Sequence, residues 1–329
     1  MSAKEGAAAY ALGAGLVLLA GAVMLSLTVG QGAVSLAEAY RAIVAHDPGD
    51  NAHITVLDVR LPRALLAVLV GAALAVSGAL VQTLTRNPLA EPGLLGVTGG
   101  ASFAVVVATQ LGASGQAVTL VVAFVGAALA AALVYAVGRA DPLRLVLAGV
   151  ALTAVLAGMS IGIRLTDPAT FDVYRFWSVG SLAGREQAPL LLPCVVLVVA
   201  LSSALLLGRA LSAVMLGDDV AHGIGASVVR TRVLTLLVAT VLAATATAVA
   251  GPIVFVGLIV PHAVRHFARA SIGWLIGLCV VFGPLLMVLS DVLARVLLET
   301  GEVPVAIVTA VLGGPALIWV VRRHGAVGV

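Results

Sequence analysis

The sequence predicts an all-α, polytopic membrane protein with about ten transmembrane helices, folded as a single domain over residues 1–329. Hydrophobic residues make up 61% of the chain and charged residues only 10%, whereas soluble domains carry about 25% charged residues. A soluble fold needs a polar shell, which this composition cannot supply. The apolar residues form continuous runs without the alternation of a membrane β-barrel, so the spanning elements are predicted to be helices.

The expected spans follow from the length of each apolar run, because a helix needs about 20 apolar residues to cross the hydrocarbon core. The eighth run is too short to cross alone. We expect it to be a half-helix or a steeply placed short span, which begins after Gly251-Pro252 and ends at Pro261. In chain order the runs are 7–29, 64–84, 94–111, 117–137, 145–163, 190–207, 233–250, 253–260, 272–298 and 303–321.

The positions of the arginines favour ten crossings over nine. With ten crossings and a cytoplasmic N-terminus, most basic residues lie on the cytoplasmic side, including Arg322 and Arg323. Nine crossings would place this terminal pair outside, against the positive-inside rule. We therefore expect both termini in the cytoplasm.

Small residues at regular places predict close helix packing, because helices in lipid associate through backbone approach and a few hydrogen bonds. The chain has 36 glycines, many beside alanines. The packing faces we expect are Gly71-Ala72-Ala73, Ser77-Gly78, Gly99-Gly100-Ala101 and Gly126-Ala127-Ala128.

The sequence lacks the residues that several enzyme classes require. Lys4 is the only lysine, so the chain has no P-loop and cannot bind ATP in that way. His262 and His266 have the spacing of a zinc pair, but the glutamate of the protease motif is missing, and we expect interfacial histidines rather than a metal site. Cys194 and Cys279 lie in apolar runs and are expected to be packed thiols. The chain is therefore predicted to be no enzyme, with no cofactor or metal of its own and no nucleic-acid partner.

Two groups of charged residues have more than one interpretation. Asp291 and Arg295 lie one helical turn apart in the ninth run. They are either a functional intramembrane pair or a structural ion pair. Arg60 and Arg63 directly precede the second run. They are either lipid anchors or a docking site for an acidic partner.

The loop between the sixth and seventh runs is predicted to dock a cytoplasmic subunit. We expect a short helix with Asp218 as its N-cap and Gly223 as its end. Gly217 and Gly223 are expected to hold backbone angles that a branched side chain resists. The predicted docking loop consists of Leu216, Gly217, Asp218, Asp219, Val220, Ala221, His222, Gly223, Ile224 and Gly225.

A series of motifs in a fixed order resembles one family, the permeases of bacterial ATP-binding-cassette (ABC) importers for ferric siderophores, haem and vitamin B12, the FecCD type of type II importer. The resemblance runs from about residue 55 to the end. The matching motifs are Arg60-x-Pro62-Arg63, residues 71–78, Arg86-Asn87-Pro88-Leu89-Ala90-x-Pro92, residues 174–182, Leu216-Gly217-Asp218-Asp219, Gly251-Pro252-Ile253-x-Phe255-Val256-Gly257 and Glu302-Val303-Pro304-Val305.

The resemblance implies partners and roles that composition alone does not. It implies a second permease subunit, as a homodimer or related heterodimer, two cytoplasmic ATPase subunits that use the ATP, and an extracytoplasmic substrate-binding protein, all at the lipid bilayer of the bacterial inner membrane. It assigns binding-protein docking to Arg60, Arg63 and Arg295, and ATPase coupling to the predicted docking loop. A cytoplasmic gate is implied at Pro142 and Leu143.

The cargo and its path are the least constrained expectations. The fifth run offers an uncharged wall for the pathway at Leu147, Val150, Thr153 and Ala154. The stretch 174–182 resembles ferric siderophore permeases more than vitamin B12 permeases, so we expect a ferric siderophore, with haem or vitamin B12 as alternatives. The outer arginines Arg164, Arg175 and Arg185 suit an anionic cargo. A secondary transporter coupled through Asp291 and a structural scaffold remain alternatives of other classes.

Overall fold

The protein is described by a computed structural model, which covers residues 3–30, 32, 34–113, 115–138, 141–185, 189–223, 225, 227–268, 271–298 and 301–324. Within these residues the regular structure is entirely helical, with fourteen α-helices and two short helices of other types. The α-helices are α1 (Ala3–Thr28), α2 (Leu36–Val44), α3 (Asn51–Ile54), α4 (Leu61–Thr85), α5 (Val97–Gln110), α6 (Gln116–Gly138), α7 (Pro142–Thr166), α8 (Pro168–Ser178), α9 (Leu191–Met215), α10 (Asp218–Gly223), α11 (Val228–Ala250), α12 (Val256–Ala268), α13 (Ile272–Val296) and α14 (Val305–His324). The others are the π-helix η1 (Thr55–Arg60) and the 3-10 helix η2 (Pro92–Leu95).

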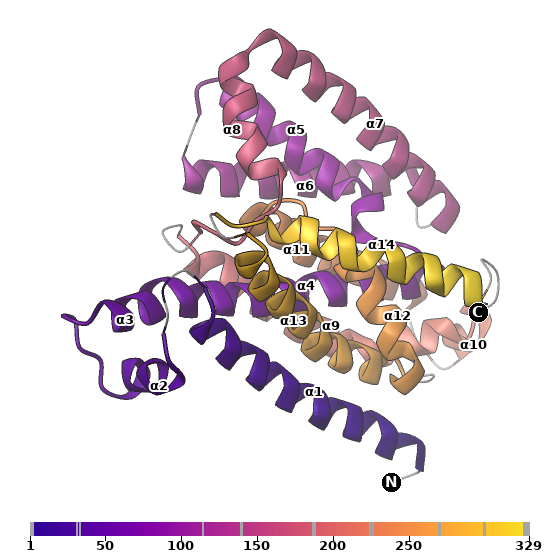
Figure 1. Ribbon diagram of the computed structural model, residues 1–329. Coiled ribbons are helices and arrows are strands. Elements are labelled where there is room, and N and C mark those ends of the chain that lie inside the picture. Colours follow the sequence, from indigo (N-terminus) through magenta and orange to yellow (C-terminus); the bar gives the residue numbers. More distant parts are fainter. Residues whose placement is uncertain are drawn as a thin grey trace.

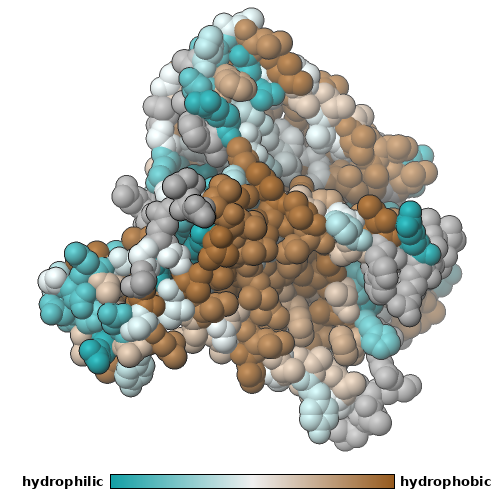
Figure 2. Space-filling model, in the orientation of Figure 1, coloured by the Kyte–Doolittle hydropathy of each residue, from teal (hydrophilic) through white to brown (hydrophobic). Residues whose placement is uncertain are grey.

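The prediction of an all-helical polytopic membrane protein is confirmed. Within the described residues, seven helical segments are long and apolar enough to cross a membrane, judged by length and composition. Two further apolar helices, Val97–Gln110 and Val305–Ile318, are shorter. Figure 2 shows a broad apolar surface across the middle of the molecule, with hydrophilic side chains gathered over α2 and α3. Each of the ten predicted runs corresponds to one of these nine segments or to α12.

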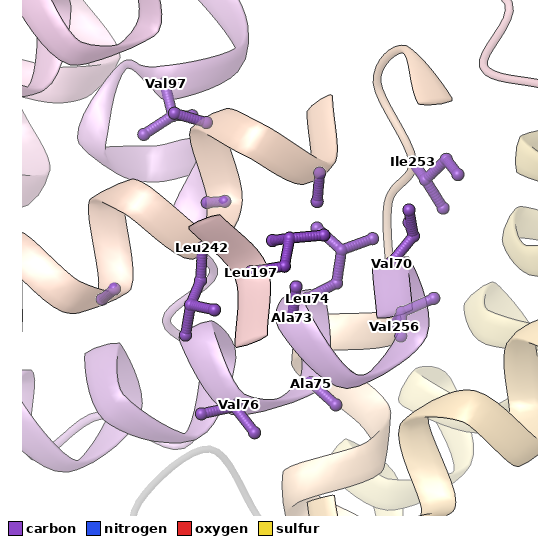
Figure 3. Close-up of a cluster of buried hydrophobic side chains, with 14 of the residues drawn as sticks. Val70, Ala73, Leu74, Ala75, Val76, Val97, Leu197, Leu242, Ile253 and Val256 are labelled. Atoms are coloured by element: carbon purple, nitrogen blue, oxygen red, sulfur yellow. The ribbon is translucent and has the colours of Figure 1, made fainter. Parts of the chain in front are cut away.

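Helix α4 forms the centre of the bundle. It packs most extensively against α13 and α11, and it also contacts α9 and α12. Figure 3 shows the core around α4, where Leu74 and its neighbours meet Val97 of α5, Leu197 of α9 and Leu242 of α11. The segment 70–83 of α4 is buried throughout, so nearly every side chain on this helix faces another helix.

Glycines bring α4 into backbone contact with two neighbours, as the small-residue faces predicted. A Cβ atom on Gly71 would lie 2.6 Å from the carbonyl oxygen of Gly283 in α13, and one on Gly78 would overlap the carbonyl oxygen of Gly257 in α12. Gly100 of α5 and Gly126 of α6 form a third pair of this kind. Because no side chain fits between these backbones, glycine is required at each contact.

The prediction that the eighth segment ends at Pro261 is wrong, because α12 continues through this residue to Ala268. Proline has no N–H, so the carbonyl of Gly257, four residues earlier, loses its helical partner. Gln82 of α4 replaces that partner: its Nε2 donates to the carbonyl oxygens of Gly257 at 3.2 Å and Leu258 at 3.3 Å. A side chain from another helix thus lets α12 pass its proline.

The loop segments also contain helices that the apolar runs did not predict. Residues 35–60 form α2, α3 and η1, and α8 follows α7. A capping box starts α2: the hydroxyl of Ser35 accepts from the N–H of Glu38 at 3.2 Å, and the carboxylate of Glu38 accepts from the N–H of Ser35 at 2.7 Å. Interactions of the Glu38 carboxylate with the side chain of Ser35 and, next, with the backbone N–H of Ser35 lower the pKa of Glu38.

Different helices and termini lie at the two ends of the bundle. In Figure 1 the start of α1, helix α10 and the end of α14 lie toward the right, while α2 and α3 lie toward the left. Helices α5, α6, α7 and α8 form a group above α4 in the same view. The predicted docking loop and the predicted docking arginines therefore belong to opposite ends of the molecule.

Candidate docking, coupling and translocation sites

Two of the three arginines predicted to dock the binding protein share one carboxylate, and the third, Arg60, lies near Arg295 beside Gly30. Arg63 of α4 donates from Nε and Nη2 to Asp291 of α13 at 2.8 to 3.2 Å, and Arg295 also pairs with Asp291. The Nη1 of Arg63 forms an ion pair with Glu302 at 2.7 Å. We call Arg60, Arg63, Arg295 and Asp291 the arginine cluster. It joins α4, α13 and the segment before α14.

Two members of the arginine cluster also cap the end of α1. Nη1 of Arg60 donates to the carbonyl oxygens of Leu27 at 2.9 Å and Thr28 at 2.8 Å. Nη1 of Arg295 donates to the carbonyl oxygen of Ser26 at 3.0 Å. The last four carbonyls of a helix have no partner within it, and cations at this end also interact favourably with the helix dipole. The sequence did not reveal this arrangement, because the partners lie about 30 and 270 residues apart.

The burial of these arginines bears on their predicted docking role. Arg60 is 3% exposed, Arg63 7% and Arg295 5%, and each guanidinium contacts groups of this chain. Direct contact with a binding protein would require these side chains to leave their internal partners. The pairing of Asp291 with Arg295 was predicted and is confirmed, whereas its pairing with Arg63 was not predicted. The docking role itself stays a prediction.

The predicted docking loop contains the short helix α10, but its boundary differs from the prediction. The helix begins at Asp218 itself, and Gly217, at φ +112°, supplies the carbonyl that accepts from the N–H of Ala221. Gly223 is a helical residue without a positive φ, so the backbone role predicted for it is wrong, while that of Gly217 is confirmed. Ile224 lies outside the described residues.

Helix α10 presents an exposed surface on a fixed base. Ala221 is buried with Val214 of α9 and Val228 of α11, which holds α10 between those two helices. Leu216 and Val220, four residues apart, are exposed, and Asp219 beside them is exposed as well. Two exposed apolar side chains with an acid beside them form a surface that a partner protein can recognise.

The predicted pathway residues share one face of α7 with a single exception. Leu143, Leu147, Val150 and Ala154 follow helical spacing and are exposed, so they form an uncharged stripe. Thr153 is half-buried instead and faces α5, where a Cβ on Gly99 would lie 3.1 Å from its side chain. Asp141 caps the helix, its carboxylate accepting from the N–H of Arg144 at 2.9 Å, and Pro142 follows as the first helical residue.

The outer arginines proposed to suit an anionic cargo are held in different ways. The guanidinium of Arg164 lies 4.6 Å from the ring centre of Tyr174. Arg175 pairs with Asp172 of the same helix at 3.2 Å. Arg185 is half-buried, and burial lowers its pKa. These arginines belong to α7, α8 and the loop that follows α8.

The sequence analysis missed two buried polar residues near α12. Gln82 receives a hydrogen bond at Oε1 from Nη2 of Arg265 at 3.0 Å, in addition to its own bonds to α12. The Oε1 of Glu91 accepts from the N–H of Phe255 at 3.1 Å, and Phe255 has φ +72°. A glutamine inside an apolar run and an acid between two prolines were the available signals. Each fixes backbone that no helix hydrogen bond can satisfy.

The structure brings no group of metal ligands together in the part of the chain that it describes. His266 is exposed and packs edge-on against Phe267, with ring centres 5.6 Å apart. Cys279 is buried and Cys194 half-buried, and both are free thiols.

Comparison with known proteins identifies relatives over nearly the whole chain. The FecCD transport family matches residues 18–323. The ferric enterobactin transport system permease protein FepD of Escherichia coli is 43% identical over 94% of this chain and 93% of its own length. The siderophore permease YfiZ of Bacillus subtilis is 36% identical over 93% of both chains. The hemin permease HmuU of Yersinia pestis is 36% identical over 95% of both.

The fold agrees with a solved relative. A structure described as a metal-chelate type ABC transporter in an inward-facing conformation superposes with a TM-score of 0.84 at 29% identity, covering 95% of this chain and 98% of the other. The predicted resemblance is thereby confirmed across the sequence and the fold. The chain belongs to the FecCD transport family and is a permease subunit of the ABC importer type.

Proposed function

We propose that this permease imports a ferric siderophore, and that the cargo resembles ferric enterobactin. The observation that carries the proposal is the 43% identity to the ferric enterobactin permease over 94% of the chain. Relatives described as siderophore, hydroxamate and dicitrate permeases, at 35 to 37% identity, support the wider class of ferric chelates. The outer arginines are consistent with an anionic complex.

Alternating access of two permease subunits would move the chelate through the membrane. The exposed, uncharged stripe of α7 is the wall that we propose for the pathway, with Pro142 and Thr153 at its borders. A second permease subunit, identical or related, would cover this stripe, because a path for a large cargo needs a second wall. The chain binds no ATP or other cofactor in this proposal, and two cytoplasmic ATPase subunits supply the energy through α10.

We further propose that the single domain spans the bacterial inner membrane ten times with both termini in the cytoplasm. The seven long helices, α5, α14 and the short α12 provide ten segments. One continuous buried core links helices from α1 to α14, which supports one domain. Cysteines placed at Arg322 and Ser227, after Cys194 and Cys279 are replaced, should both react only with a cytoplasmic reagent. Labelling of position 322 from outside would contradict the ten crossings.

The cargo is tested by transport in proteoliposomes that contain the permease, its ATPase and its binding protein. We expect ATP-dependent uptake of ferric enterobactin and little uptake of haem, vitamin B12 or ferric dicitrate at equal concentration. Preferred uptake of haem would instead support the second candidate, which the 36% identity to the hemin permease HmuU favours. Uptake driven by a proton gradient without ATPase would support a secondary transporter and contradict the proposal.

The docking role of Arg60 and Arg63 stays part of the proposal and needs a test that separates docking from folding. Charge reversal at Arg63 should weaken binding of the substrate-binding protein and reduce its salt dependence if the arginines meet acids on that protein. The same change should lower stability, because it breaks the pairing with Asp291. An affinity that stays unchanged in correctly folded Arg60→Gln and Arg63→Gln variants would leave the arginines with their internal contacts only.

A further inference from the structure

Two adjoining cavities lie at the end of the bundle that carries α10. The first, of about 450 Å³, lies between the ends of α4 and α9 and the start of α13, and Arg86 and Arg265 line it. The second, of about 410 Å³, lies between α9 and α13 and is lined by Arg209 and Gly277 among others. Ser212 and Ser271 line both cavities, so the two join along α9 and the start of α13.

The joined cavities carry positive charge without compensation. No aspartate or glutamate lines either one, and in the described part of the chain no carboxylate pairs with Arg86, Arg209 or Arg265. One nitrogen of Arg265, Nε, is buried and has no hydrogen-bond partner among the described residues. Three guanidinium groups and the hydroxyl of Ser271 line this space, and donors of these kinds bind a phosphate group. The hydroxyl of Ser212 already donates to the carbonyl oxygen of Gly208 at 2.8 Å.

The backbone at Arg86 adds to this argument. Arg86 caps α4 in the left-handed conformation, with φ +51°. A residue with a Cβ atom pays about 1 kcal/mol or more to adopt this conformation, which glycine and asparagine tolerate better. The cap therefore does not explain an arginine here, whereas its place in the wall of the first cavity does.

The depth of the second cavity decides between a lipid and a soluble partner. Gly277 lies five residues into α13, which is about 7.5 Å along the helix. A Cβ atom on Gly277 would meet nothing within 4 Å, and one on Gly273 would meet only Ser271 Oγ at 3.9 Å. The cavity thus continues as an open, small-residue groove between two membrane-spanning helices. An acyl chain fits such a groove, and a soluble polypeptide does not reach it.

We propose that the joined cavities bind an anionic phospholipid. Its phosphate lies between Arg86, Arg265 and the hydroxyl of Ser271, and one acyl chain follows the groove between α9 and α13. Trp274, the third residue of α13, lines the second cavity, and indole rings favour the membrane interface. With the proposed orientation of the chain, the lipid comes from the cytoplasmic leaflet, where anionic headgroups attract basic residues.

Occupancy would stabilise the base of α10. Met215 and Leu216, which line the first cavity, are the last residues before the turn at Gly217 that leads into α10. A lipid held here restrains the end of α9, and through it the surface proposed to contact the ATPase. This consequence rests on the proposed function, but the binding site does not.

The binding is tested on the full-length chain in detergent by native mass spectrometry. The probes are dioleoyl phosphatidylglycerol, dioleoyl phosphatidylcholine and inorganic phosphate. We expect saturable binding of phosphatidylglycerol well above phosphatidylcholine. Arg86→Gln and Arg209→Gln should each weaken it roughly fivefold, because one arginine near an anionic headgroup contributes about 1 kcal/mol. Arg230→Gln is the matched control, since this exposed arginine of α11 lines neither cavity and should leave binding unchanged.

A second pair of variants tests the acyl-chain groove independently of charge. Gly277→Leu should fill the groove and weaken phosphatidylglycerol binding, while Gly21→Leu, on an open face of α1, should not. Equal binding of both lipids, or unchanged binding in Arg86→Gln and Gly277→Leu, would overturn the proposal. Displacement of the lipid by millimolar phosphate would overturn it in favour of a free-anion site. Unchanged lipid binding together with lost ATPase binding would assign the arginines to that protein instead.

Discussion

Arg63 in α4 and Asp291 in α13, 228 positions apart, form the most completely hydrogen-bonded ion pair in the described part of the chain. Both side chains are buried, and Arg295 pairs with the same carboxylate. Asp291 thus pairs with two buried arginines, of which Arg63 also pairs with Glu302. This arrangement favours the structural interpretation of the Asp291–Arg295 pair, since the pair is part of a network that joins α4, α13 and the segment before α14.

The arginine cluster predicts a strong dependence of stability on Asp291. Asp291→Asn should lower the free energy of unfolding by about 3–5 kcal/mol, because two buried guanidinium groups lose their charged partner. Glu302→Gln should cost far less, since this carboxylate is 27% exposed and contacts only Arg63. Thermal unfolding of both purified variants in detergent checks the difference. Equal losses would show that Asp291 has no special role in the cluster.

The passage of α12 through Pro261 predicts a coupling between two residues on different helices. Gln82→Leu should destabilise the protein by about 1–3 kcal/mol, because the carbonyl of Gly257 loses its donor. In a Pro261→Ala background the alanine N–H can reach that carbonyl, so the same change should cost less. A double-mutant cycle on thermal stability measures the coupling. Strictly additive effects would mean that Gln82 does not replace the missing N–H.

The contact of Gly78 with Gly257 predicts a sharp size limit. Gly78→Ala should reduce folded protein, because the new methyl group overlaps the carbonyl of Gly257 and must push α4 and α12 apart. Gly158→Ala, where the methyl meets nothing within 4 Å, should be neutral or slightly stabilising, by less than about 1 kcal/mol. The yield of monodisperse protein in size-exclusion chromatography compares the two. Normal yield of the Gly78 variant would contradict the close contact.

The two glycines that flank α10 predict different effects on coupling. Gly217→Val should impair ATP-driven transport, since valine at φ +112° strains the turn into α10. Gly223→Val should have a smaller effect, because Gly223 has no positive φ and an added Cβ meets nothing within 4 Å. The ratio of substrate transported to ATP hydrolysed, measured in proteoliposomes, checks this prediction. A normal ratio in both variants would remove this turn from the coupling mechanism.

The sequence was sufficient where the physics is local. Apolar length placed the spans, and small residues at Gly71, Gly78 and Gly100 marked true backbone contacts. The i, i+4 spacing of Asp291 and Arg295 predicted an ion pair that forms.

The sequence was insufficient where a partner lies far along the chain. Pro261 stops a helix by its own chemistry, and only the approach of Gln82, 179 positions earlier, lets α12 continue. The capping of α1 by Arg60 and Arg295 is equally non-local. For the same reason the arginines first assigned to an outer surface proved to be buried.

The short length of α12 has a consequence for biogenesis. Its 13 residues rise about 20 Å, less than the roughly 30 Å of the hydrocarbon core. Two backbone groups at the start of this helix rely on side chains from elsewhere. The N–H of Phe255, just before α12, donates to Glu91, and the carbonyl of Gly257, which Pro261 leaves without a helical donor, accepts from Gln82. Both donors and acceptors come from a part of the chain that leaves the ribosome much earlier. The α12 segment therefore cannot enter the bilayer as an independent unit, and its insertion must wait for a template formed by α4 and η2.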